Sequence, residues 1–170
     1  MRQALLAWIM TVAGCVTDSE PYPVAAVANL EPLGSEITGP IEVIGPPSAA
    51  SQRTLTAQHV RLPDGEPRRV RIFELDVCDS SAAPAIAYAD LQEIRRVGDQ
   101  THFFALDLTV EGRRVDVDTR TVMAYVSTDP ADPQGYVIGK IAVVQELDHD
   151  DGTPGRWLAC GAFAVTGAAR

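Results

Sequence analysis

Histidine and carboxylate side chains are the first groups to consider, because they bind metal ions and transfer protons near neutral pH. The sequence holds three histidines, His59, His102 and His149. His149 is flanked by Asp148 and Asp150, so carboxylate oxygens and one imidazole could hold a divalent ion weakly on a loop. A solvated acidic turn is the favoured interpretation of this run. The other two histidines stand in strand-like runs, where surface or hydrogen-bonded histidines are ordinary.

Other catalytic arrangements do not stand out in the sequence. It has no Ser-His-Asp spacing of the kind used in nucleophilic catalysis and no glycine-rich phosphate loop. The carboxylates of Asp107, Asp116 and Asp118 alternate along strand-like runs, as side chains on a solvated face do. We therefore expect no catalytic residue among these groups.

Charge and composition narrow the class of protein. The net charge is -9, from 14 Lys+Arg and 23 Asp+Glu, which disfavours binding to nucleic acid or to anionic lipid headgroups. A chain of 170 residues that is 46% hydrophobic can build one domain with a real core. The 12 prolines and 13 glycines are spread along the chain, which favours many short strands joined by turns.

The beginning of the chain is typical of an exported lipoprotein. Arg2 precedes an apolar run over 4–13 that has the length of a signal-peptide core and is too short to span a bilayer. The sequence Val-Ala-Gly-Cys that ends at Cys15 resembles the bacterial lipobox, in which the cysteine is diacylated and becomes the new N-terminus. We expect residues 1–14 to be a lipoprotein signal peptide. An ordinary hydrophobic start with a chance cysteine is the alternative.

The mature chain would then be anchored to a membrane through its first residue. Acyl chains on Cys15 bury enough methylene groups for stable attachment, and residues 15–23 are predicted to form a lipidated tether. Val16 is not the aspartate that resembles an inner-membrane retention signal. This favours a location in the bacterial envelope on the outer membrane, facing the periplasm or the exterior. Residues 24–170 are the predicted folded domain.

Two cysteines remain after Cys15, namely Cys78 and Cys160. An exported protein meets an oxidising compartment, so this even pair is predicted to form a disulfide. Closing the long loop between them would stabilise the fold by roughly 4 kcal/mol in the chain-entropy model. Two independently buried thiols are the alternative.

Alternation of apolar and polar residues in short runs dominates the rest of the chain and indicates strands with one buried face. The run His102–Val110 is the clearest, and together with Arg114–Val117 it predicts a hairpin. The stretch Ala85–Arg96 is helix-like, and Pro84 before it suits a helix start or a loop. The pattern predicts an all-β, mostly antiparallel sandwich or flattened barrel of about eight strands. The other predicted strands are Val24–Leu30, Ile37–Ile44, Arg53–Leu62, Arg69–Val77, Thr121–Val126, Val137–Gln145 and Leu158–Val165.

Several segments resemble the Cu,Zn superoxide dismutase family. Residues 155–163 (GRWLACGAF) resemble its closing strand, whose R-L-A-C-G-V-I signature carries one disulfide cysteine. Residues 70–74 (VRIFE) resemble its F-H-V-H-E strand, and Cys78 follows at the spacing of the family's other disulfide cysteine. Residues 95–99 (RRVGD) resemble its H-V-G-D, and residues 137–146 (VIGKIAVVQE) resemble its I-I-G-R-x-L-V-V-H-E. The resemblance covers the whole folded domain, implies a Greek-key barrel and supports the disulfide.

The resemblance also implies where copper would bind, and there this chain departs from the family. The two copper histidines of H-V-H are replaced by Arg71 and Phe73, the late copper histidine by Gln145, and residues 79–86 contain no bridging histidine. Dismutation alternately reduces and reoxidises a copper ion that several imidazoles hold. We expect Arg71 and Phe73 to fill the copper side by a charged hydrogen bond and by packing. Exposed, unrelated side chains are the alternative.

The positions of the zinc ligands and of the superoxide-steering arginine also differ from the family's. A zinc histidine falls at Arg96, and Asp99 alone keeps a zinc-ligand type, which is too little where four ligands are usual. We expect Arg96 to pair with Asp99. The arginine that steers superoxide falls at Trp157, with Arg156 one residue away.

These departures predict a membrane-tethered, dismutase-like domain that works as a binding or structural module in the envelope. It is expected to hold no copper or zinc, to lack dismutase activity and to have an unidentified protein partner. A divergent superoxide dismutase that holds copper or zinc at an unusual site is one alternative. A weak metal carrier that uses the acidic run beside His149 is another.

Overall fold

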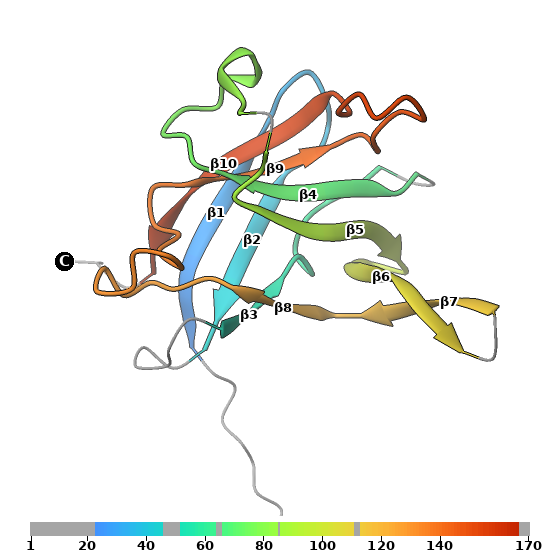
Figure 1. Ribbon diagram of the computed structural model, residues 1–170, viewed down its shortest axis with the longest axis horizontal. Helices are drawn as coiled ribbons and strands as arrows, with labels where there is room; N and C mark the ends of the chain where they lie inside the picture. The colour runs from blue at the N-terminus through green and yellow to red at the C-terminus, as the bar shows by residue number, and fades with distance from the viewer. Residues whose placement is uncertain (1–22, 46–51, 64–65, 85, 111–112, 167–170) are drawn as a thin grey trace, which may run out of the picture.

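A computed structural model describes residues 23–45, 52–63, 66–84, 86–110 and 113–166 (Figure 1). In this part of the chain ten strands form one continuous sheet, and the only helical element is a single 3-10 turn, η1. The predicted all-β fold is confirmed. The elements are β1 (Val24–Pro32), β2 (Gly39–Ile44), β3 (Gln52–Thr56), β4 (Arg68–Phe73), η1 (Ser80–Ala82), β5 (Ala89–Val97), β6 (Gln100–Val110), β7 (Arg113–Thr119), β8 (Thr121–Tyr125), β9 (Ile141–Gln145) and β10 (Trp157–Val165).

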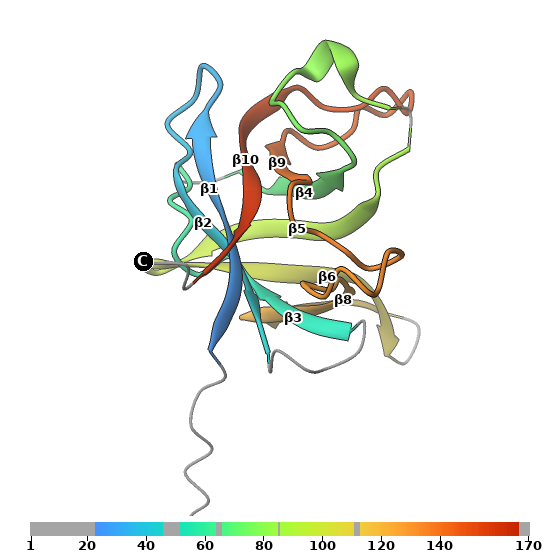
Figure 2. The same cartoon turned by 90° about the vertical axis from the view of Figure 1, so that its left-hand side faces the viewer.

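The sheet runs in the order β7-β6-β5-β4-β9-β10-β1-β2-β3-β8, and all its pairings are antiparallel. Strands β3 and β4 follow one another in sequence but are separated in the sheet by β9, β10, β1 and β2. The sheet curls so that β8, at one end, contacts β5 and β6 (Figure 2). The result is a nearly closed barrel in which β1 and β10, the first and last strands in sequence, are neighbours.

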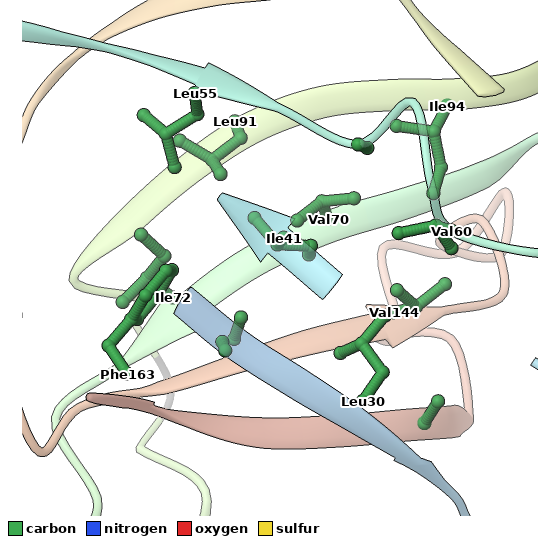
Figure 3. Packing of buried hydrophobic residues seen from close by; sticks show 14 of the residues in the cluster. Leu30, Ile41, Leu55, Val60, Val70, Ile72, Leu91, Ile94, Val144 and Phe163 are labelled. Carbon is green, nitrogen blue, oxygen red and sulfur yellow. The ribbon is translucent and has the colours of Figure 1, made fainter. Parts of the chain in front are cut away.

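The barrel interior is an apolar core built by strand alternation. On β1 the buried residues Ala26, Ala28 and Leu30 alternate with more exposed positions, and on β2 Ile41 and Val43 do the same. Figure 3 shows such side chains from several strands converging between the walls of the barrel. Each fully buried aliphatic or aromatic side chain contributes about 1.5–3 kcal/mol to folding.

The predicted helix over Ala85–Arg96 is wrong, because β5 occupies most of it and pairs with both β4 and β6. The helix-like signal is the three-residue spacing of the buried residues Leu91 and Ile94. That spacing comes from a β-bulge, where the β4–β5 register shifts and Gln92 has a φ of 148°. An extra residue in one strand lets two residues three apart face the same side of a sheet.

Three predicted strands are shorter in the structure than in the prediction. The strand expected over Arg53–Leu62 ends at Thr56, and the strand expected over Arg69–Val77 ends at Phe73. The strand expected from Val137 begins only at Ile141, because Lys140 N donates to Val137 O in a tight turn. The predicted hairpin of His102–Val110 with Arg114–Val117 is present as β6 and β7.

A second, smaller apolar cluster lies on the outer face of the barrel over β4, β9 and β10. We call it the outer cluster, and its buried members are Phe73, Ile141, Val143, Trp157 and Cys160. The segment between β4 and β5, which carries η1, runs beside β9 and β10 (Figure 1). Its Leu75, Ala83 and Ala87 side chains pack against the outer cluster. Strand β9 is therefore buried on both faces, which explains its continuous run of apolar residues.

The predicted disulfide is confirmed. Cys78, in the segment after β4, is bonded to Cys160 in β10, with the two Cα atoms 6.1 Å apart. Cys160 is fully buried in the outer cluster, whereas Cys78 is exposed. The bond therefore ties the covering segment to the barrel wall.

Candidate functional site

A cleft of about 640 Å³ opens beside the outer cluster, and we call it the outer cleft. One wall is the segment between β4 and β5, and another is the loop between β9 and β10. Its lining residues are Arg71, Phe73, Ser80, Ala83, Pro84, Ile86, Ala87, Asp90, Asp148, Gly152, Pro154, Gly155, Arg156 and Trp157.

A network of two arginines and two aspartates forms the charged side of this cleft. Arg71 Nη1 donates to Asp148 Oδ1 at 2.9 Å and Nη2 donates to Asp148 Oδ2 at 2.5 Å, a two-pronged contact. Arg71 Nε donates to Asp90 Oδ2 at 3.2 Å. Arg69 also donates two hydrogen bonds to Asp90, from Nε to Oδ1 at 2.9 Å and from Nη2 to Oδ2 at 2.7 Å. Two-pronged guanidinium–carboxylate contacts are among the stronger and more directional ion pairs in proteins.

The β5 bulge is what brings Asp90 into this network. In the observed register Arg71 lies opposite Asp90, and Val70 lies opposite Gln92. A regular strand would place Leu91 opposite Arg71, because partners advance one residue at a time. Opposite residues share a face of the sheet, so the extra residue turns the Asp90 carboxylate to the outer face beside both arginines.

Asp148 is held from three directions. Besides Arg71, Gln145 Nε2 donates to its Oδ1 at 3.2 Å, and the backbone N–H of Gly155 donates to the same atom at 3.3 Å. A side chain at Gly155 would collide with the backbone oxygen of Glu146, at 2.1 Å from an added Cβ. The glycine therefore permits the close approach that brings its N–H to the carboxylate.

These contacts stabilise the charged forms of both partners. The hydrogen bond from Arg71 holds the pKa of Asp148 below its usual range, against the opposing effect of partial burial. Burial disfavours the charged form of Arg71, but the hydrogen bonds and negative charges of Asp148 and Asp90 outweigh it and raise its pKa. Arg71 and Asp148 therefore stay ionised over the whole neutral range.

Two aromatic rings form the apolar side of the cleft. The Phe73 and Trp157 ring centroids are 5.1 Å apart, with 33° between the ring planes, and both residues are buried. Arg156, next to this pair, projects into solvent and donates from Nη2 to Glu146 Oε1 at 3.0 Å. That contact lowers the pKa of Glu146. Ile86 lies at the rim with 83% of its surface exposed.

The structure brings some of the residues singled out in the sequence together and separates others. Arg71, Phe73 and Gln145 all lie on the outer face of the adjacent strands β4 and β9. Arg96 and Asp99 instead lie at the turn between β5 and β6, and they line a different cleft.

The expected pairing of Arg96 with Asp99 is wrong. Both residues are exposed, and Arg96 Nε donates to the backbone oxygen of Gly98 at 3.0 Å. Within the described ranges no ion pair joins the two side chains.

The acidic run after β9 is built as a turn. The backbone N–H of His149 donates to Thr153 O, and Asp151 Oδ1 accepts from Thr153 N. Hydrogen bonds from the Thr153 side chain and then from its backbone lower the pKa of Asp151. Asp148 is engaged by Arg71, and Asp150 is exposed. In the part of the chain that the structure describes, no group of three or more His, Cys, Asp or Glu side chains is placed to hold a metal ion.

The other two histidines lie apart from the outer cleft. His59 Nδ1 is 3.1 Å from Glu42 Oε2 near the surface. His102 is buried on β6, opposite Arg95 of β5. The expected lipidation residue Cys15 lies outside the described residues. Among the described residues no helix has the length and apolar character needed to cross a membrane.

The sequence reasoning missed three parts of this site. Arg69 and Arg71 stand two apart in an alternating strand, a spacing that places both on one face and could have been noticed. Asp90 lay inside the stretch interpreted as helix, so its place beside β4 was hidden. Asp148 was considered as a metal ligand and not as an arginine partner.

Comparisons with known proteins support the fold. No protein-family model matches the chain, and no curated protein matches it in sequence. The crystal structure of the clock protein EA4 is similar to it, with a TM-score of 0.50 and 18% sequence identity. The similar region covers 85% of this chain and 96% of that chain. At this level of identity the likeness concerns the fold alone.

Proposed function

We propose that this chain is a lipid-anchored, superoxide dismutase-like protein of the bacterial envelope that binds a ligand in the outer cleft and does not dismutate superoxide. One observation carries the proposal: Arg71 and the buried amide of Gln145 both donate hydrogen bonds to the Asp148 carboxylate. In the sequence resemblance, Arg71 and Gln145 stand at copper-histidine positions. A permanent cation with its paired carboxylate occupies the place where that resemblance would put a metal ion.

The residues at these positions do not fit copper. A guanidinium carries only donors and stays protonated, so Arg71 cannot be a ligand. Phe73 has no donor atom and packs on Trp157. The Gln145 amide nitrogen donates a hydrogen bond to Asp148, and the Asp148 carboxylate also accepts from Arg71. A copper that cycles between two oxidation states needs several imidazoles in a fixed geometry, and this set supplies none.

The outer cleft offers what a binding site needs. Its aromatic side would contact an apolar group, and its charged side is held in place by several hydrogen bonds. Ligand sites in proteins commonly combine an apolar lining with a few fixed polar groups. Ile86, exposed at the rim, would be covered by a ligand or partner seated there. The disulfide holds the wall of the cleft that carries this residue.

Metal analysis together with a superoxide assay tests the proposal. We expect purified protein, after exposure to copper and zinc and removal of excess metal, to hold no stoichiometric metal and to show no dismutase activity. A matched variant, Arg71→His with Phe73→His and Gln145→His, restores three imidazoles and is expected to gain copper affinity. Stoichiometric copper with activity in the unaltered protein would overturn the proposal and favour the divergent dismutase.

The anchor is tested separately. In a bacterial host, the full chain is expected in the membrane fraction, and Cys15→Ser is expected to move it to the soluble fraction, because acyl chains supply the attachment. Cys78→Ser serves as the matched control, since it removes a cysteine without removing the acceptor. Equal membrane association of the Cys15→Ser variant would contradict lipidation.

A further inference from the structure

A second cleft, of about 510 Å³, shares no lining residue with the outer cleft. It lies between the segment after β3 and the turn that joins β5 to β6, and we call it the turn cleft. Its lining residues are Gln58, His59, Val60, Arg61, Leu62, Arg96, Asp99, Gln100 and Thr101.

The turn cleft is lined by two arginines in a chain with a net charge of -9. These are Arg61 and Arg96; His59, also in the lining, lies with Nδ1 3.1 Å from Glu42 Oε2, and Asp99 is the one carboxylate among the lining residues. Gln58 and Gln100 add neutral amide donors. Arginine and amide N–H groups are donors of the kind that bind anions in proteins.

Arg61 has a guanidinium that the rest of the protein does not use. Its backbone is fixed by the bridge to Thr38, with N–H donating to Thr38 O at 2.7 Å. Its side chain is exposed, and within the described ranges it has no ion pair or hydrogen bond. All five of its donors are therefore available to a ligand. This distinguishes it from Arg71, whose donors contact two carboxylates.

The two walls of the turn cleft are tied together before any ligand arrives. Thr101, itself buried, donates from Oγ1 to the backbone oxygen of Val60 at 2.6 Å. Its backbone N–H donates to Gln58 O at 3.4 Å. Thr101 also lies opposite Arg96 in the β5–β6 pairing. The segment that carries Arg61 is thus held against the strand pair that carries Arg96, which reduces the entropy lost on binding.

We propose that the turn cleft binds a tetrahedral oxyanion, the phosphate or sulfate group of a small ligand. Arg61 is the principal contact, because its planar fork can donate two parallel hydrogen bonds to such a group. Arg96 lies on the opposite wall, and the Gln58 and Gln100 amides complete the set of donors. Asp99, also in the lining, accepts a hydrogen bond from a hydroxyl of the rest of the ligand.

Titration of the full chain with inorganic phosphate and with sulfate, followed by ¹⁵N–¹H NMR, tests the proposal. The ionic strength is held constant with sodium chloride so that unspecific screening does not change. We expect saturable shifts of the Gln58 and Gln100 side-chain amides and of the Arg61 Nε–H group with either anion. Shifts that rise linearly with concentration, or shifts confined to other residues, would overturn it.

Two variants make the test specific. Arg61→Gln removes the charge from an exposed side chain without a partner, so the fold is kept, and it should weaken phosphate binding about tenfold, the value of one charge-assisted hydrogen bond. Arg120→Gln, at an exposed arginine that lines neither cleft, is the matched control and should leave binding unchanged. Equal weakening in both variants, or acetate binding as tightly as phosphate, would show unspecific charge attraction and refute the proposed site.

Discussion

The two clefts use arginine in opposite ways. In the outer cleft, Arg71 gives its donors to Asp148 and Asp90, and the network is supported by Gln145. In the turn cleft, Arg61 has a fixed backbone and a guanidinium without a partner among the described residues. The comparison teaches that an arginine whose donors are already used fixes the wall of a cleft, whereas an arginine with unused donors can itself bind an anion. Arg71 is part of the architecture, and Arg61 is available.

The largest expected effect comes from removing the disulfide, which supports only one of the two clefts. Cys78→Ser with Cys160→Ser should lower the free energy of unfolding by about 4 kcal/mol, because the unfolded chain regains loop entropy. Denaturant unfolding measures this loss. The phosphate-induced shifts of Gln58 and Gln100 should persist in the folded variant, since neither cysteine lines the turn cleft and Cys160 lies in the outer cluster. Their disappearance would show that the clefts are coupled.

The second effect comes from breaking the network at Arg71. Arg71→Ala should lower the free energy of unfolding by about 2–3 kcal/mol, because it leaves Asp148 partly buried without its counter-charge. The Arg71 and Asp148 side chains are 14% and 27% exposed, which limits the loss below that of a fully buried pair. The matched variant Arg156→Ala, at an exposed pair, should lose less than about 1 kcal/mol. Equal losses would contradict the structural role assigned to Arg71.

A smaller effect is expected from acid. The folded-state pKa of Asp148 lies below the ordinary value of 3.8, so its contribution to stability is complete above that value and is lost as pH falls through the lowered folded value. Denaturant midpoints measured between about pH 5 and about pH 2 should therefore fall more steeply in the unaltered protein than in Asp148→Asn. Arg61→Gln should keep the unaltered slope. Parallel curves for all three would exclude the ionised network.

The smallest effect on stability is expected at Arg61. Arg61→Gln should change the free energy of unfolding by less than about 0.5 kcal/mol, as exposed substitutions without partners do. Denaturant unfolding and the phosphate titration would then separate the two residues. The Arg61 variant should lose phosphate binding and keep its stability, whereas the Arg71 variant should lose stability. A large destabilisation by Arg61→Gln would remove the contrast between the two clefts.

Much of the fold could be predicted from alternation, as for Ala26, Ala28 and Leu30 of β1. The prediction failed at β5, because a bulge gives the buried residues Leu91 and Ile94 a helical spacing. Sequence patterns record which residues are apolar, but a bulge depends on the neighbouring strand, which alternation along one segment does not identify.

The candidate site divides in the same way. The sequence resemblance predicts a charged hydrogen bond and packing at Arg71 and Phe73, whose residue types are read directly from the chain. The partners were not visible: Asp148 lies 77 residues from Arg71 in sequence, and Asp90 lies 19 residues away. A sequence does not show which distant carboxylate a guanidinium will meet.

The sequence by itself determined the class of fold and the cysteine pair, because apolar alternation and residue type are read directly along the chain. The tertiary structure alone decided that Arg71 is saturated and Arg61 is not, and that Arg96 and Asp99 lie in a separate cleft. The reason is that hydrogen-bond satisfaction depends on which strands become neighbours, and strand neighbours are set by the packing of the whole barrel.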